Sequence, residues 1–119
     1  MIVADASAVV AALLNDGPAR RNLASLPIHA PHLLDVEVVS VLQRLSLSGQ
    51  LDPPLAERMI NVLANLGIRR HSSMGLLGRI WRLSGNLTAY DATYVALAET
   101  LECPLLTSDR RLARSGGPR

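Results

Sequence analysis

The sequence contains no lysine and no phenylalanine, and Cys103 is its one cysteine. Without lysine, the chain cannot contain a P-loop lysine, a Schiff-base lysine or the lysine on which receiver-type phosphoacceptor domains rely. A lone cysteine cannot form an internal disulfide, and a free thiol is typical of a reducing cytoplasm. We therefore expect a cytoplasmic protein that is stabilised by its apolar core.

Long hydrophobic runs are also absent. The longest apolar run covers residues 8–14, which is far short of the roughly 20 residues that a membrane-spanning helix needs. The apolar N-terminus has no positively charged region in front of it, because the first basic residue is Arg20. A signal peptide would carry such a region. We expect no membrane association.

The residues that are present predict one globular domain over residues 1–119. Hydrophobic residues make up 49% of the chain and charged residues 18%, which is the composition of a folded domain. All twelve basic residues are arginine, and the net charge is +2. Planar guanidinium groups suit contacts with phosphate, but genome composition explains the same bias, so both explanations stay open.

Short apolar segments alternate with stretches of helical periodicity. We expect helices over 8–14, 19–26, 33–47, 53–66, 76–83, 88–101 and 108–113, and strands over 1–4, 28–31, 68–71 and 104–107. Pro31 limits the second strand to a short edge strand. Strands separated by helices predict an α/β three-layer sandwich with a central, mostly parallel sheet.

The helix expected over 33–47 is apolar nearly all round. Val36 and Val39 lie away from its main apolar stripe, which predicts a central position or a second face that is buried against a partner chain. Trp81 has helical spacing with Leu77, which indicates a core or interface residue. Stacking on a nucleic-acid base is the alternative role for this side chain.

Two acids follow predicted strands. Asp5 comes directly after the first strand, and Asp109 comes two residues after Thr107 at the end of the last. Ligands of parallel α/β sheets bind outside the carboxyl ends of the strands, so this placement is typical of a functional site. Each acid taken alone also has a structural explanation, as a strand-end or helix-capping carboxylate.

Two further acids lie on predicted helices. Asp91 falls in the first turn of its helix if Thr88 is the N-cap, a position that also favours an acid for structural reasons. Glu37 and Asp35 flank the apolar stripe of the helix over 33–47 on opposite sides. The helical periodicity does not choose between these two acids.

Four segments, taken in order, resemble the four acidic motifs of PIN-domain ribonucleases, and most closely those of VapC toxins from bacterial toxin–antitoxin pairs. They are Ile-Val-Ala-Asp-Ala-Ser at 2–7, Leu-Asp-Val-Glu-Val at 34–38, Thr-Ala-Tyr-Asp-Ala at 88–92 and Leu-Thr-Ser-Asp-Arg-Arg-Leu at 106–112. The resemblance covers nearly the whole chain and implies a PIN-like fold. It implies that the catalytic, metal-binding carboxylates are Asp5, Glu37, Asp91 and Asp109, with Ser7 and Thr107 supporting them.

Crowded carboxylates need a cation. Two unit charges about 4 Å apart repel by roughly 4 kcal/mol at an effective dielectric constant of 20, and no lysine can neutralise them. Oxygen-only ligands favour Mg²⁺, with Mn²⁺ as a substitute, over zinc. His29 and His32 lack the spacing of a helical zinc pair, and Pro31 lies between them. We expect them in a loop.

The expected function is therefore that of a Mg²⁺-dependent endoribonuclease, which hydrolyses RNA phosphodiesters by a metal-activated water. The resemblance implies products with 5′-phosphate and 3′-hydroxyl ends. An acidic site repels RNA, so basic side chains must attract it. The candidates nearest to the motifs in sequence are Arg79, Arg82, Arg110 and Arg111.

The resemblance also implies partners, namely a homodimer and a cognate antitoxin that blocks the site. One departure concerns the C-terminus. PIN domains usually have a further strand after the helix that begins near Asp109, but no apolar run follows before Arg119. We expect this edge strand to be missing, truncated or supplied by a partner.

Two other functions remain open. The first is a catalytically silent PIN-like module that binds only an antitoxin or RNA, although binding alone gives no reason to gather four carboxylates. The second is a metal-dependent deoxyribonuclease or flap-type nuclease, which would use the same site chemistry. Only a comparison of substrates separates this second alternative from a ribonuclease.

Overall fold

The computed structural model describes residues 1–109 and Leu112. Its centre is a four-stranded sheet of order β3-β2-β1-β4, in which every neighbouring pair is parallel. Val3 in the central strand pairs with His29 on one side and Leu105 on the other. The strands are β1 (Ile2–Ala4), β2 (Ile28–Pro31), β3 (Arg69–His71) and β4 (Leu105–Leu106).

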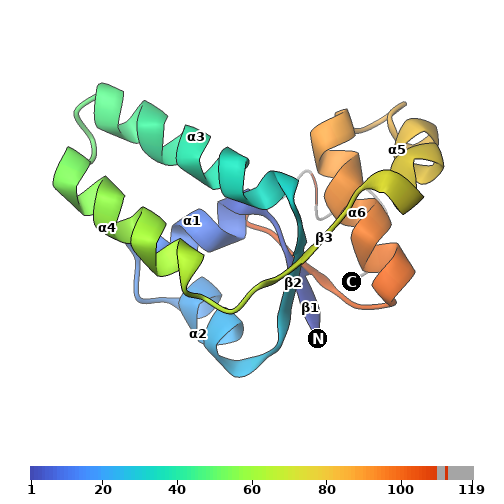
Figure 1. Cartoon of the computed structure of the whole chain (residues 1–119), viewed down its shortest axis with the longest axis horizontal. Helices are drawn as coiled ribbons and strands as arrows, with labels where there is room; N and C mark the ends of the chain where they lie inside the picture. Colours follow the sequence, from blue (N-terminus) through green and yellow to red (C-terminus); the bar gives the residue numbers. More distant parts are fainter. Residues whose placement is uncertain (110–111, 113–119) are drawn as a thin grey trace.

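Helices cover both faces of the sheet, so the predicted three-layer α/β sandwich is confirmed (Figure 1). On one side lie α1 (Ala6–Leu14), α2 (Pro18–Ser25), α3 (Leu33–Leu47) and α4 (Pro53–Ala64). On the other side lie α5 (Leu77–Leu83), which follows a 3₁₀ turn over Met74–Leu76, and α6 (Ala89–Leu101).

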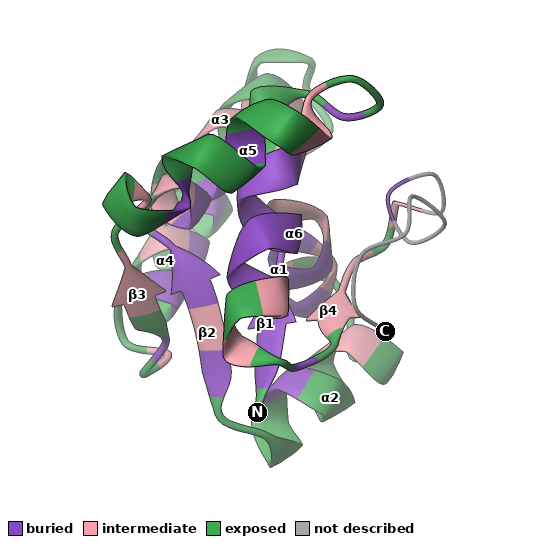
Figure 2. Ribbon diagram, turned by 90° about the vertical axis from the view of Figure 1, so that its right-hand side faces the viewer, coloured by how far each residue is buried: buried purple, intermediate pink, exposed green. Residues whose placement is uncertain are grey.

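The most deeply buried elements are β1 and α6 (Figure 2). All three residues of β1 are buried, as is every residue of α6 from 92 to 98. Alanine recurs along this part of α6, at positions 92, 96 and 98. Its small side chain lets the helix backbone approach the sheet closely, which holds the start of α6 next to the strand ends.

Local signals in the sequence explain where the helices begin and end. Pro53 occupies the first turn of α4, where its missing N–H costs no hydrogen bond. Thr88 caps α6 by accepting a hydrogen bond from the Asp91 N–H. Gly49, just after α3, has a φ of +78°, a backbone conformation that glycine adopts without strain.

The prediction of an edge strand at 28–31 was wrong. β2 lies inside the sheet, between β1 and β3. Pro31 does not prevent this because β1 pairs only with the first half of β2, at Ile28 and His29. Pro31 is the last residue of β2, opposite His71 on β3, so its missing N–H removes no bond to β1.

The prediction of a central position for the helix at 33–47 was also wrong. Leu34, Val38 and Leu42 of α3 are buried against the molecule. Val36, in contrast, is 70% exposed and Val39 is 39% exposed. The second apolar face of α3 is therefore open to solvent within one chain.

The last predicted helix, 108–113, and the question of a C-terminal edge strand both concern residues 110–111 and 113–119, which lie outside the described part. Within the described part, no helix combines the length and the apolar character that a membrane crossing requires.

Candidate active site

Asp5 lies directly after β1, at the carboxyl edge of the sheet, and is the N-cap of α1. Its Oδ1 accepts hydrogen bonds from the Ala8 N–H at 2.9 Å and the Ser7 hydroxyl at 2.7 Å. The residue is only 5% exposed. Burial raises the pKa of the Asp5 carboxyl, and the hydroxyls of Thr107 and Ser7 and the Ala8 N–H act against this rise.

Ser7 and Thr107 join the ends of β1 and β4. Their hydroxyl oxygens are 3.3 Å apart, and the Ser108 N–H donates to the Ser7 oxygen at 2.9 Å. The Asp5 N–H donates to the Leu106 carbonyl, which sets these two chain segments side by side. Both predicted supporting residues therefore lie next to the Asp5 carboxylate.

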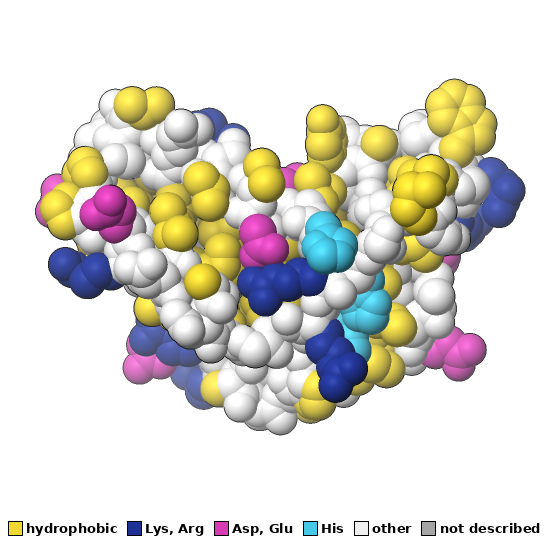
Figure 3. All heavy atoms as spheres, viewed as in Figure 1, with side chains coloured by type: hydrophobic (Ala, Val, Ile, Leu, Met, Phe, Trp, Pro, Cys, Tyr) yellow, Lys and Arg dark blue, Asp and Glu magenta, His cyan; other side chains and the backbone are white. Residues whose placement is uncertain are grey.

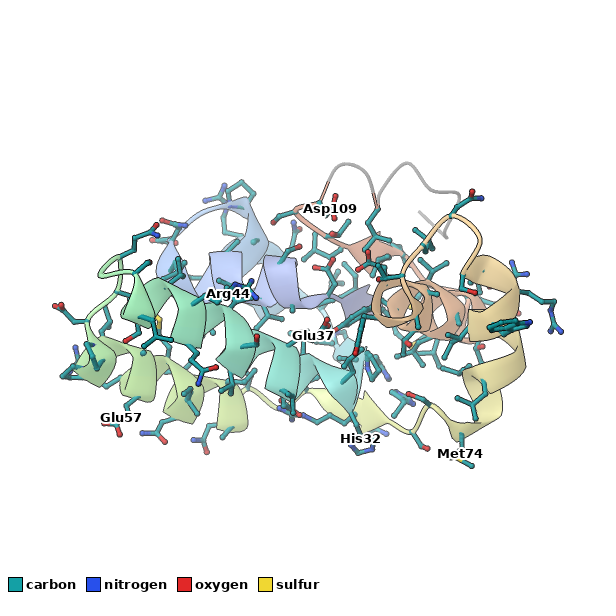
Figure 4. All side chains as sticks on the ribbon, turned by 90° about the horizontal axis from the view of Figure 1, so that it is seen from above. His32, Glu37, Arg44, Glu57, Met74 and Asp109 are labelled. Carbon is teal, nitrogen blue, oxygen red and sulfur yellow. The ribbon has the colours of Figure 1, made fainter. Side chains whose placement is uncertain are left out.

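Glu37 extends from α3 toward α6, above the strand ends (Figure 4). Its Oε1 accepts a hydrogen bond from the Tyr94 hydroxyl at 2.5 Å. The pKa of Glu37 is raised, first by burial and then by the negative charges of Asp91 and Asp5, and the Tyr94 hydrogen bond acts against this rise. Tyr94 itself has a raised pKa because it is buried beside this carboxylate.

Asp91 occupies the first turn of α6, as the sequence predicted. Its N–H donates to the Thr88 hydroxyl at 3.1 Å, so the helix-capping explanation holds for its backbone. Its carboxylate also acts on the two other acids, because its negative charge raises the pKa of both Asp5 and Glu37. Three carboxylates from three separate elements therefore repel one another at the carboxyl edge of the sheet.

Asp109 lies at the end of the described chain, beyond β4. Its N–H donates to the Thr107 hydroxyl at 3.0 Å, and its Oδ1 accepts from the Leu112 N–H at 3.3 Å. Asp109 thus contacts the Thr107 hydroxyl, which also borders Asp5. Figure 4 shows it across from Glu37.

The structure separates the two acids between which the helical pattern could not choose. Arg70 on β3 holds Asp35 with two hydrogen bonds, of 2.8 and 3.0 Å. Within the described residues, no ion pair is made by Asp5 or Glu37. Asp35 is therefore neutralised in a structural ion pair, whereas Glu37 faces the other carboxylates.

No metal ligand set is assembled in full. Over residues 1–109 and Leu112, no three side chains of Asp, Glu, His or Cys are placed so that they could hold one metal ion together. The carboxylates approach closely enough to influence one another's pKa, but they do not form a closed cage.

The predicted RNA-binding arginines have different surroundings. Arg79 on α5 donates two hydrogen bonds to Glu99 on α6, at 2.8 and 3.0 Å. Arg82 lies in the last turn of α5 and is exposed. Arg110 and Arg111 lie outside the described residues.

The loop prediction for the histidines was wrong for His29. This residue lies on β2, and its Nδ1 is 2.8 Å from Nε2 of His71 on the neighbouring strand. The two imidazole rings therefore connect β2 to β3. His32, as expected, lies between elements, just before α3.

Sequence reasoning missed Tyr94 as a partner of Glu37. The side chain is buried in α6, where a tyrosine hydroxyl needs a hydrogen-bond acceptor. The chain has few aromatic residues, so a tyrosine among the alanines and valines of this helix was the one signal in the sequence that a polar partner is needed here. The acceptor, however, is 57 residues away in the sequence, and only the fold brings the two residues together.

One apolar cavity is separate from the acids. It measures about 560 Å³ and lies between α1, α2 and α4. Its lining is mostly apolar, with Leu23 and Met59 among the lining residues, and none of the four acids contributes to it. The cavity is therefore not part of the carboxylate site.

Comparisons with known proteins agree on one family. The PIN domain model matches residues 2–117. Ribonuclease VapC9 of Mycobacterium tuberculosis is 48% identical over 116 residues, which are 98% of this chain and 91% of the relative. Ribonuclease VapC1 of the same species is 43% identical over 120 residues, which cover 97% of this chain and 90% of the relative.

Solved structures show the same fold. PAE2754 from Pyrobaculum aerophilum superposes with a TM-score of 0.80 at 24% identity, covering 99% of this chain and 87% of that one. Mycobacterium tuberculosis VapC20, described as a sarcin–ricin loop cleaving toxin, superposes with a TM-score of 0.73 at 18% identity, covering 98% of this chain and 96% of that one. The chain therefore belongs to the PIN domain family and, within it, to the VapC-type ribonuclease toxins.

Proposed function

We propose that this protein is a Mg²⁺-dependent endoribonuclease, the toxin of a toxin–antitoxin pair, in which Asp5, Glu37, Asp91 and Asp109 act at the metal. The observation that carries the proposal is the placement of Asp5, Glu37 and Asp91, which come from three elements to one edge of the sheet, near enough for their charges to act on one another. A protein that only bound a partner would gain nothing from this arrangement. The relatives named as ribonucleases support the same activity.

The donor set fits Mg²⁺. This ion takes oxygen ligands, keeps several of its waters and usually binds a protein through one or two carboxylates. A closed cage of three or more side chains is therefore not required. Burial raises the pKa of Asp5 and of Glu37, and neither carboxylate makes an ion pair within the described residues. A divalent cation would stabilise their ionised forms. Mn²⁺ would substitute for Mg²⁺.

Each residue then has a defined role. Asp5 and Glu37 would hold the cation, with Asp91 and Asp109 completing the negative charge around it. Ser7 restrains Asp5 by donating to its Oδ1. The Thr107 hydroxyl lies between the Asp5 carboxylate and the Asp109 N–H and bonds to both. When bound, the metal supplies Lewis-acid stabilisation of the phosphate and a lowered pKa for an attacking water.

Arginines would bring RNA to this acidic site. We expect Arg82, Arg110 and Arg111 to contact phosphates, because guanidinium groups bind them through paired hydrogen bonds. Arg79 stays in this group as a weaker candidate, since its guanidinium already binds Glu99. The surface is hollowed between α3 and the α5–α6 side (Figure 3), where a strand of RNA would pass over the carboxyl edge of the sheet.

We expect the protein to work in the cytoplasm as a homodimer that a cognate antitoxin inactivates. The exposed apolar side chains include Val36 and Val39 on α3, and Leu77 and Trp81 on α5. Exposed apolar groups of this kind are typical of protein–protein interfaces. Trp81 is 80% exposed, so of its predicted roles the core position is wrong, and an interface or base-stacking role is left.

The test is cleavage of a mixed RNA pool by antitoxin-free protein in Mg²⁺, beside an Asp91→Asn variant and a reaction in EDTA. We expect the wild type to cut and both controls to be inactive. Mapping the ends of the fragments would identify the RNA, and single-stranded and duplex DNA in parallel would expose a deoxyribonuclease.

The opposite result would favour the silent binding module. If folded wild type and Asp91→Asn are equally inert toward all RNAs, in Mg²⁺ and in Mn²⁺, the enzymatic proposal is wrong. Activity that persists in EDTA would leave ribonuclease activity in place and contradict the metal.

A further inference from the structure

We propose that Tyr94 is a positioning residue for Glu37, and that its hydroxyl determines which carboxylate oxygen faces the metal. The inference rests on the proposed function, because it needs a cation at this edge of the sheet. It starts from one contact, the 2.5 Å hydrogen bond from the Tyr94 hydroxyl to Glu37 Oε1.

The two residues come from opposite layers of the sandwich. Glu37 extends from α3, and Tyr94 lies on α6, on the other side of the sheet. Their bond crosses above the strand ends, where Figure 4 shows Glu37 between the two helices. Tyr94 is 1% exposed, so packing of the ring in the core fixes the position of the hydroxyl.

Glu37 needs such a restraint. A glutamate side chain has several rotatable bonds, and ordering it costs conformational entropy. The charges of Asp91 and Asp5 also repel its carboxylate, and Glu37 is only partly buried, so it would otherwise turn toward solvent. Tyr94 is the hydrogen-bond partner of this carboxylate within the described residues, and it opposes that movement.

The bond also gives the two oxygens of the Glu37 carboxylate different partners. At neutral pH a tyrosine hydroxyl is protonated and donates, so it occupies Oε1. Oε2 then remains for the cation or for one of its waters. Glu37 is thereby set up as a ligand through one oxygen, which suits an ion that keeps most of its hydration shell.

A purely structural role for the same bond would be to fasten α3 to α6. The two roles predict different results for metal binding. A fastening bond affects the stability of the fold and leaves the affinity for metal unchanged once the protein is folded. A positioning bond affects the affinity itself, since partners of metal ligands typically contribute about 10- to 100-fold.

The experiment is calorimetric titration of Mn²⁺ into the antitoxin-free wild type, Tyr94→Phe and Thr93→Val. Thr93 is the matched control: its buried hydroxyl, on the same helix, donates to the Ala89 carbonyl and not to an acid. We expect Tyr94→Phe to bind Mn²⁺ about 10- to 100-fold more weakly and Thr93→Val to bind like the wild type. Equal affinities for the two variants would overturn the inference.

A double-mutant cycle checks that Tyr94 acts through Glu37. In a Glu37→Gln background, adding Tyr94→Phe should cause no further loss of Mn²⁺ affinity. An equal loss in both backgrounds would contradict the proposed path. If wild type neither binds Mn²⁺ nor cuts RNA, the proposed function fails together with this inference; if it does both and Tyr94→Phe is unaffected, only the inference fails.

A measurement on the wild type covers the case in which Tyr94→Phe does not fold. The chain has two tyrosines, so labelling their Cζ with ¹³C gives two NMR signals, which Tyr90→Phe assigns. Addition of Mg²⁺ should shift the Tyr94 signal to saturation, and the shift should be absent in Glu37→Gln. A Tyr94 signal that does not respond to Mg²⁺ would overturn the inference.

Discussion

Asp5 combines two properties that oppose each other. Its Oδ1 caps α1, which stabilises the fold, while burial of its charge beside other carboxylates raises its pKa and destabilises the ionised form. The opposition explains why the site is expected to lower stability in the absence of a cation. A functional site commonly keeps such a local conflict, which the rest of the fold must offset.

Removing the charge of Asp5 while keeping its cap should stabilise the metal-free protein. In Asp5→Asn, the amide oxygen can still accept from the Ala8 N–H and the Ser7 hydroxyl, and asparagine is as good an N-cap as aspartate. We expect a gain of about 1 kcal/mol in the free energy of unfolding in EDTA, measured by chemical denaturation. A loss of stability would mean that the ionised carboxylate is fully compensated within the protein.

The stability of the protein should also depend on pH because of these buried carboxylates. The folded protein holds protons on Asp5 and Glu37 more tightly than the unfolded chain, since burial raises both pKa values above 3.8 and 4.5. Their contribution to stability is therefore fully present below those ordinary values and is lost as the pH rises through the raised ones. In EDTA, the advantage of Asp5→Asn over wild type should grow across this range; an advantage independent of pH would contradict the assignment. Excess Mg²⁺ should reduce the advantage at the upper end.

At the scale of elements, three features show how far the sequence could be interpreted. Helical periodicity and caps located α3 to the residue and α6 to within one residue, because these signals are local. The place of β2 inside the sheet depends on its register with β1, which no local signal contains. The choice of Glu37 over Asp35 came from the family motif, and the physical reason is the ion pair of Asp35 with Arg70 on another element.

The Arg70–Asp35 ion pair should matter for the fold and not for the metal. It ties β3 to α3, and the Arg70 guanidinium also donates to the Ile68 carbonyl. Because the Arg70 side chain is 23% exposed and that of Asp35 is 38% exposed, solvent weakens the pair, and we expect Arg70→Ala to cost about 1 kcal/mol of unfolding free energy. Arg79→Ala, whose pair with Glu99 is solvent-exposed, should cost less. Mn²⁺ affinity should be unchanged in both variants, and a large loss in Arg70→Ala would contradict the separation of the two acids.

At the scale of the whole molecule, the position of the apolar surface predicts self-association. Exposed apolar side chains include Val36, Val39 and Leu47 on α3 and Leu77 and Trp81 on α5, and apolar groups are visible over both regions in Figure 3. We expect light scattering after size exclusion to give a dimer for the wild type and a monomer for Leu77→Asp. A wild type that is monomeric at high protein concentration would contradict the dimer and leave the chemistry of the site unaffected.

RNA binding should depend on salt, and Arg82 should contribute to that dependence more than Arg79. Loss of one phosphate contact lowers the slope of log affinity against log salt by about 1. We expect this change in Arg82→Ala. It is measured by fluorescence anisotropy of a labelled RNA in a buffer without divalent metal, so that the RNA is not cleaved. The matched variant Arg79→Ala should change the slope less, because Glu99 already holds that guanidinium. Equal slopes in wild type and Arg82→Ala would remove Arg82 from the RNA-binding surface.

The central claim is that the carboxylates gathered at the carboxyl edge of the sheet catalyse RNA hydrolysis with a divalent cation. The most direct measurement compares the rates of RNA cleavage in Mg²⁺ by Glu37→Gln and Asp35→Asn, two acid-to-amide changes on the same helix. We expect Glu37→Gln to lose about 100-fold or more of the activity, and Asp35→Asn to keep activity close to that of the wild type as long as it is folded. Full activity in Glu37→Gln, or an equal loss in both variants under folded conditions, would contradict the claim.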